Sequence, residues 1–331
     1  MKMNSTLNGN KMVFTEDMLN NYAQPLSATE DQQCQNAIRM VIDAIKPLGF
    51  SETRSAVERM YGESHAYYQE LKSNYGSRKI KVFLQGSYAN NTNVRTQSDV
   101  DIAVVEEDIF QTAYRSGVTD SNYGFVTASP RTKTFKDEVE DALKSKFGSD
   151  VERKNKSIKI NGNTYRKDAD GVPCRRHKDF RWDFGNDPNN YVGGIVIIAD
   201  SGERIINYPE QHIKNGKEKN TATNFYYKKM VRIIKKMKYL MCEQGIDSAD
   251  KVSSFALESL MWNIPNEKYL EFKDYRKVYM FDNLIEYLYS NQYNLATYKE
   301  ANGIKDLCPT QEFMTNIKNF INDLRQFYGY R

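Results

Sequence analysis

Two short stretches of this 331-residue chain combine residue types that could bind a nucleotide and a metal ion. In the first, a tight turn at Gly86 and Ser87 is expected to begin a helix whose free backbone N–H groups can bind phosphate oxygens. Eleven residues separate Ser87 from Asp99. Asp99 and Asp101 share one face of a predicted strand because side chains alternate along a strand. Two carboxylates beside a phosphate-binding turn are suited to Mg²⁺ held together with substrate phosphates.

Each stretch is weak evidence when it is taken alone. Gly-Ser is common in turns, and Asp-x-Asp at a strand end is usually a solvated pair. Their order, and the run of Val and Ile residues that continues to Val105, favour a metal–nucleotide site over that interpretation.

The pattern of Gly-Ser, about a dozen residues and then Asp-x-Asp resembles the DNA-polymerase-β-like nucleotidyltransferases. The resemblance implies two Mg²⁺ ions, with Mn²⁺ as a possible substitute, bound by Asp99, Asp101 and a third carboxylate from a later strand. In that family the third aspartate lies three residues before a proline, which Asp170 and Pro173 match. Asp168, two residues earlier on the same face, is the main alternative, and both could instead be acids near a turn. Such a site must deprotonate a 3′-hydroxyl and place it in line with an α-phosphate.

Composition limits the classes of protein that fit this chain. Hydrophobic residues make up 40% and charged residues 27%, as in ordinary globular proteins. The net charge of +4 gives no overall polyanion-binding surface, so phosphate binding is expected to be local. The cysteines are widely spaced and there are only three histidines, which argues against structural zinc and against a disulfide scaffold. The longest apolar run, Ile195 to Ala199, is too short to span a bilayer, so a cytoplasmic protein without a membrane segment is expected.

Several elements are predicted around the two motifs. A capping box at Ser27 and Glu30 should begin a helix that ends near residues 47–49, and a second helix is predicted over residues 51–75. Both are expected to brace a catalytic sheet whose first strand covers residues 79–84.

After the Asp-x-Asp strand, residues 106–131 are predicted to form a polar loop. Residues 134–147 should form a helix, and Asn161-Gly162 is predicted to be the type I′ turn of a hairpin that returns through Asp170. Further strands are predicted over 191–199 and 204–208, and the polar residues 215–220 are expected to link two lobes.

The second lobe is predicted to be helical, and its first helix covers residues 221–244. Lys228, Arg232, Lys235 and Lys236 lie along one side of that helix, which by itself is most simply a solvated basic face. The tail from residue 267 to 331 is also helical but carries no motif that we can assign.

The order of Val231 to Lys235, a loop and then Ser254 to Glu258 is similar to a narrower group, the oligoadenylate synthetase and cyclic GMP–AMP synthase branch with its bacterial relatives, the CD-NTases. The resemblance implies that Lys235, with Arg232 as a helper, holds the triphosphate, that Ser254 reaches the γ-phosphate and that Phe255 stacks on the base. Lysine is a suitable point charge for phosphate, and every base offers a π-face to an aromatic ring.

The resemblance implies an α+β fold with a polymerase-β-like core in residues 1–215, a helical lobe in residues 216–331 and a cleft between them. It implies a template-independent enzyme that joins NTPs into a cyclic di- or trinucleotide, releases pyrophosphate and so activates an effector protein in anti-phage (CBASS) signalling. The zinc-binding insertion of the animal enzyme is missing and the net charge is low, so a nucleic-acid activator is not expected.

Two other functions are compatible with the sequence. One is a different transferase of the same fold that modifies RNA or protein, which the helical-lobe motif disfavours. The other is a catalytically inactive nucleotide- or RNA-binding module, which the complete carboxylate set disfavours because clustered charges are costly without catalysis.

Overall fold

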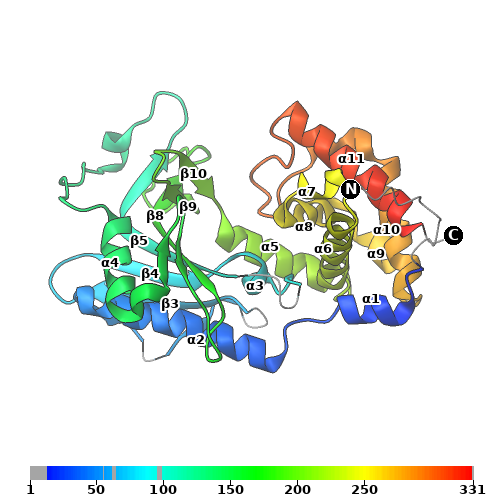
Figure 1. Cartoon of the computed structure of the whole chain (residues 1–331). Helices are drawn as coiled ribbons and strands as arrows, with labels where there is room; N and C mark the ends of the chain where they lie inside the picture. Colours follow the sequence, from blue (N-terminus) through cyan, green and yellow to red (C-terminus); the bar gives the residue numbers. More distant parts are fainter. Residues whose placement is uncertain (1–12, 55, 62–64, 95–98, 330–331) are drawn as a thin grey trace, which may run out of the picture. The chain divides into compact units, whose positions relative to one another are not determined.

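The computed structural model describes residues 13–54, 56–61, 65–94 and 99–329. The chain divides into two compact units (Figure 1). One contains residues 25–217 and is built on a mixed sheet, and the other joins residues 218–331 to the N-terminal segment 13–24. The predicted α+β class with a separate helical part is therefore confirmed.

The first unit is organised around one mixed sheet in the order β1-β3-β4-β5-β8-β7-β6, and β9 and β10 extend it along the second half of β8. Its strands are β1 (Phe50–Glu52), β2 (Glu58–Arg59), β3 (Tyr67–Ser73), β4 (Lys79–Leu84), β5 (Val100–Ala113), β6 (Val151–Arg153), β7 (Ile158–Ile160), β8 (Ala169–Asp179), β9 (Val192–Ile198) and β10 (Arg204–Asn207). Neighbouring strands are antiparallel except the long pair β5 and β8, which is parallel.

Helices α2 (Ala28–Ile45) and α4 (Phe135–Phe147) share one apolar core with β3, β4 and β5. Both helices begin with capping boxes, at Ser27 with Glu30 as predicted and at Thr134 with Asp137. Alternate residues of β5, such as Val100 and Ile102, point into this core. The residues between them point to the opposite face, where Ala103 joins a smaller apolar cluster.

The prediction of a second helix over residues 51–75 is wrong. Where the structure describes this segment it forms β1, β2 and β3, because the residues of β3 alternate between the core and the opposite face. Tyr68 pairs with Phe83, and Leu71 pairs with Ile80, in the ladder with β4. Tertiary pairing therefore overrides a pattern that also fits helical spacing.

Two predicted loops are also corrected. Residues 106–113 continue β5 instead of starting a loop, because β8 pairs with them beyond a register shift between Glu106 and Phe110. The predicted hairpin exists, but β7 and β8 are joined by residues 161–168 and not by a two-residue turn at Asn161 and Gly162.

The predicted linker at residues 215–220 lies inside the continuous helix α5 (Pro209–Ala222). Gly216 allows this helix to pack closely, since a Cβ there would come within 2.8 Å of the Asn90 side-chain oxygen. The polar composition therefore marks a partly exposed helix, and the strands predicted on either side of residue 200 are confirmed as β9 and β10.

The second unit is helical, as predicted. Its helices are α1 (Glu16–Tyr22), α6 (Tyr227–Glu243), α7 (Asp247–Asp250), α8 (Ser254–Asn263), α9 (Asn266–Leu270), α10 (Lys277–Ser290) and α11 (Gln311–Tyr328). They surround one core to which α6, α8, α10 and α11 all contribute buried side chains. Among the described residues, no helix is long and apolar enough to cross a membrane.

The N-terminal segment belongs to this helical unit. The prediction that it forms part of the sheet unit, as residues 1–215, is therefore wrong for this segment. Phe14 is buried against Tyr328, with the rings stacked 5.2 Å apart, and Leu19 is fully buried in the same core. These apolar contacts are long-range in sequence, so a polar, Asn-rich N-terminus gave no sign of them.

Candidate active site

The parallel pairing of β5 and β8 places Asp101 directly opposite Asp170. Residues opposite each other in adjacent strands point to the same face, so the two carboxylates lie side by side on the face away from α2 and α4. The next residue along this row, across the antiparallel pair of β8 and β7, is Lys159. Asp101, Asp170 and Lys159 therefore form one polar row across three strands.

The Gly86-Ser87 turn lies against this row. The backbone N–H of Gln85 donates to the carbonyl oxygen of Asp101 at 2.9 Å, and α3 (Gly86–Asn90) begins at the next residue. Gly86 has φ of 67°, and a Cβ at this position would lie 2.4 Å from a carboxylate oxygen of Asp101. Only glycine fits here without a shift, both because of its backbone conformation and because of the carboxylate.

The carboxylates of this row are difficult to ionise without a cation. Burial, together with the negative charges of Asp170 and Asp99, raises the pKa of Asp101 to about 7. Burial and Asp99 also raise the pKa of Asp170, although a hydrogen bond from the Ser157 hydroxyl at 3.2 Å partly opposes this. A bound divalent cation would favour the ionised forms that these surroundings disfavour.

Asp99 lies at the more exposed end of the cluster, just before β5. Its side chain is 41% exposed, and its carboxylate lies 3.5 Å from the Lys159 ammonium group. The charges of Asp99 and Asp168 raise the pKa of Lys159, in that order of size. Lys159 was not among the predicted site residues; the alternation of Ile158, Lys159 and Ile160 on a strand next to Asp170 is the sequence feature that could have identified it.

The structure separates Asp168 from Asp170. Asp168 precedes β8, its side chain is 45% exposed, and its carboxylate accepts a hydrogen bond from the backbone N–H of Gly162. It therefore orders the loop between β7 and β8. Asp170 is the register partner of Asp101 in the ladder, and its assignment as the third carboxylate stays a prediction.

The donor set suits a hard divalent cation, because it consists of carboxylate oxygens close to a phosphate-sized turn. In the part of the chain that the structure describes, however, no three His, Cys, Asp or Glu side chains are grouped tightly enough to hold a metal ion. Asp101 and Asp170 form the preorganised pair, and Asp99 is drawn toward Lys159. Metal binding at this row thus requires Asp99 or the substrate to supply further oxygens.

Two of the predicted site residues in the helical unit are buried, whereas the sequence by itself indicated a solvated basic face. Arg232 and Lys235 on α6 are 4% and 3% exposed, so they do not lie on a solvated basic face. Arg232 Nε donates to the carbonyl oxygen of Ala23 at 2.7 Å. The Lys235 ammonium group lies 2.8 Å from the carboxylate of Glu258 on α8, which is 1% exposed. Glu258 lies within the motif of residues 254–258 but is not among the predicted site residues.

Ser254 and Phe255 lie at the start of α8. The helix begins at Ser254, and the preceding residue, Ser253, caps it by accepting a hydrogen bond from the backbone N–H of Ala256 at 3.0 Å. Ser254 is half-buried, and Phe255 is 37% exposed in an otherwise buried helix. The Phe255 side chain is therefore partly accessible to solvent.

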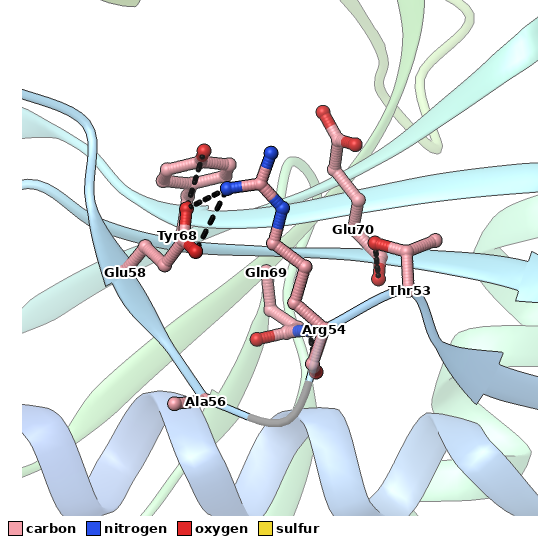
Figure 2. Close-up of a pocket in the computed structure, with 7 residues that line it drawn as sticks. All are labelled: Thr53, Arg54, Ala56, Glu58, Tyr68, Gln69 and Glu70. Carbon is pink, nitrogen blue, oxygen red and sulfur yellow. Dashed lines mark hydrogen bonds and ion pairs between the residues drawn. The ribbon is translucent and has the colours of Figure 1, made fainter.

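Two cavities of the first unit lie away from the carboxylate row. Figure 2 shows the smaller, where Arg54 and the Tyr68 hydroxyl both donate to the carboxylate of Glu58, at 2.6 Å and 3.0 Å. With a volume of about 10 Å³, it has room for a water molecule but not for a nucleotide. The larger groove, of about 890 Å³, includes Lys81 and Arg176 and lies toward the other end of β4 from Gly86.

Comparison with known proteins matches each of the two units to a protein family. Residues 67–162 match the nucleotidyltransferase domain family, and residues 214–329 match the family described as the cGAS/DncV-like nucleotidyltransferase C-terminal helical domain. The cyclic GMP-AMP synthase CdnE03 of Staphylococcus schleiferi is 47% identical over 96% of this chain and 98% of that protein. A cyclic dipyrimidine nucleotide synthase CdnE of Cecembia lonarensis is 34% identical over 89% of this chain and 90% of its own length. The solved structure of the Elizabethkingia meningoseptica CdnE cyclic dinucleotide synthase with GTP and Apcpp has a TM-score of 0.69 and 32% identity, and covers 96% of this chain and 100% of that one.

The first prediction concerns Asp101 in the metal-free protein. Because the folded state raises its pKa to about 7, it retains a proton that the unfolded chain has released, so this residue lowers stability as pH rises from about 4 to about 7. Asp101→Asn should therefore raise the melting temperature at pH 8, and the increase should vanish near pH 4. Each kcal/mol gained in the free energy of unfolding raises the melting temperature by about 2–4 °C. Thermal unfolding in EDTA across this pH range measures it, with the more exposed Asp168→Asn as control. A difference that does not change with pH would contradict the argument.

The second prediction concerns the buried pair of Lys235 and Glu258. Lys235→Met strands a buried carboxylate and should destabilise the helical unit by about 3–5 kcal/mol. Adding Glu258→Gln should restore most of that loss. If Lys235 also binds phosphate, the double variant should regain its melting temperature but not its affinity for ATP or GTP, measured by calorimetry. Recovery of both quantities would make the pair purely structural.

Proposed function

Because the chain belongs to the CdnE family of cyclic nucleotide synthases, within the cGAS/DncV-like nucleotidyltransferases, we propose that it joins two NTPs into a cyclic dinucleotide without a template. Each bond forms when a ribose hydroxyl oxygen attacks the α-phosphate of a donor NTP, and pyrophosphate leaves with the electrons of the broken P–O bond. The single observation that carries this proposal is the row of Asp101 and Asp170 beside the Gly86-Ser87 turn.

The residues of the sheet unit would divide the work of this reaction. Two Mg²⁺ ions held by Asp99, Asp101 and Asp170, or Mn²⁺ in their place, would supply the positive charge that activates the hydroxyl and stabilises the leaving group. Asp170, which is the register partner of Asp101, would orient the attacking hydroxyl and accept its proton. The turn at Gly86 and Ser87 would donate backbone N–H groups to the donor phosphates.

In the helical unit, we assign Ser254 to the γ-phosphate and Phe255 to stacking on the donor base. The half-buried hydroxyl of Ser254 at the start of α8 and the accessible ring of Phe255 support these roles. Lys235, with Arg232 nearby on the same helix, would add positive charge at the triphosphate. Since Lys235 is paired with Glu258, we expect Glu258 to set how far the ammonium group can reach.

For the product, cyclic GMP–AMP is the first candidate. The relative that is 47% identical is named a cyclic GMP-AMP synthase, whereas one that is 34% identical is named for two pyrimidines. The bases therefore differ between relatives of this chain. Because the more similar of these two relatives is named for purine nucleotides, we expect purine bases in the product of this chain. The product would act on an effector protein, in keeping with a role in anti-phage signalling.

The direct test is incubation of the purified protein with all four NTPs and Mg²⁺ or Mn²⁺, followed by mass spectrometry of the products. We expect a cyclic dinucleotide with purine bases and release of pyrophosphate, and no product from Asp101→Asn. Binding of NTP without pyrophosphate release would instead indicate an inactive binding module. Transfer of nucleotides only to added RNA or protein would indicate another kind of transferase.

A further prediction separates Asp170 from Asp168. Asp170→Asn should lower turnover by orders of magnitude with a weaker effect on donor NTP binding, because its carboxylate faces Asp101. Asp168→Asn should be milder, because that carboxylate orders the loop through Gly162. Initial rates of pyrophosphate release and NTP titrations of both variants measure the ranking, and the reverse ranking would assign the third carboxylate to Asp168.

A further inference from the structure

We propose that Lys159 is a built-in cation that competes with the divalent metal for Asp99, so that metal binding at the site requires Asp99 to leave Lys159. This inference rests on the proposed function, because it concerns how the same carboxylates acquire their metal. Lys159 is a positioning residue in this proposal, since it acts through Asp99 and not on the substrate.

The position of Lys159 is set by the sheet. It lies on β7 with its Cα opposite that of Asp170, which in turn is opposite Asp101. Its ammonium group lies 3.5 Å from the carboxylate of Asp99 and 3.8 Å from that of Asp168, and its side chain is 27% exposed. The lysine is therefore at the end of the carboxylate row and engages the one carboxylate of the predicted triad that lies outside the two strands.

The three carboxylates of the predicted metal site are held in different ways. Asp101 and Asp170 are held side by side by backbone pairing, whereas Asp99 is held by a side chain that carries positive charge. In the described part of the chain no three acidic, histidine or cysteine side chains form a metal-binding group. Releasing Asp99 from Lys159 would free a third set of carboxylate oxygens for a cation.

Two electrostatic effects then depend on Lys159. Without metal, its charge offsets the repulsion among Asp99, Asp101 and Asp170, which stabilises the empty site. With metal, the same charge repels the incoming cation, and a unit charge a few ångströms from a divalent ion in a partly exposed site weakens binding by roughly tenfold. Loss of the charge should therefore destabilise the metal-free protein and strengthen metal binding.

The test is titration of the full-length protein with Mn²⁺ alone, followed by electron paramagnetic resonance of the free ion. Lys159→Met should lower the dissociation constant for Mn²⁺ at least fivefold and lower the melting temperature in EDTA. Lys159→Arg, which keeps the charge, should remain within twofold of the parent. Lys156→Met is the matched control, because Lys156 is paired with Glu203 at 3.3 Å and not with Asp99, Asp101, Asp168 or Asp170.

The outcomes separate this inference from the proposed function. If Lys159→Met and Lys159→Gln bind Mn²⁺ no more tightly than the parent, while Asp101→Asn abolishes binding, the metal site stands and the competition is disproved. If the parent and Asp101→Asn bind Mn²⁺ equally, the metal site itself fails, and the competition fails with it. Tighter binding in the Met and Gln variants but not in the Arg and Lys156→Met variants supports the inference.

Discussion

The parallel pairing of β5 with β8 is the constraint on which the rest of the sheet unit depends. It fixes the register that sets Asp101 opposite Asp170, and so it concentrates negative charge where burial already disfavours ionisation. Backbone hydrogen bonds hold these side chains at this spacing whatever their charge state. Carboxylates held this close together favour a bound cation, because positive charge stabilises the ionised forms that burial and mutual repulsion disfavour.

Other features of the unit follow from that row. The turn after β4 must pass so close to Asp101 that a side chain at Gly86 would collide with its carboxylate. The two faces of β5 are used differently: Val100 and Ile102 anchor the strand in the core beneath α2 and α4, which leaves the alternate positions free for polar side chains. The apolar face thus supplies the stability that lets the opposite face carry unfavourable charge.

The helical unit also contains buried charges, but there they are of opposite sign and in contact. Lys235 and Glu258 are both almost inaccessible to water, and their mutual contact at 2.8 Å offsets the cost of burying two charges. Well-packed apolar residues are often as stable as a buried ion pair, so stability alone does not account for charges at this point of α6 and α8. Arg232 on the same helix ties the N-terminal segment to this unit through the carbonyl oxygen of Ala23.

The sequence alone determined the chemistry and much of the architecture. Gly86, Asp99 and Asp101 are close in the chain, the capping box at Ser27 marks the start of α2, alternation marks the start of β5 and a continuous apolar run marks β9, so local physics was enough to predict them. Only the tertiary structure decided features that depend on partners distant in sequence. It made β3 a strand through its ladder with β4, placed Phe14 and Leu19 in the helical core, buried Lys235 against Glu258 and brought Lys159 to Asp99. A pattern of residue types indicates which faces are apolar, but which strand pairs with which, and which charges meet, is determined by long-range packing that no local window contains.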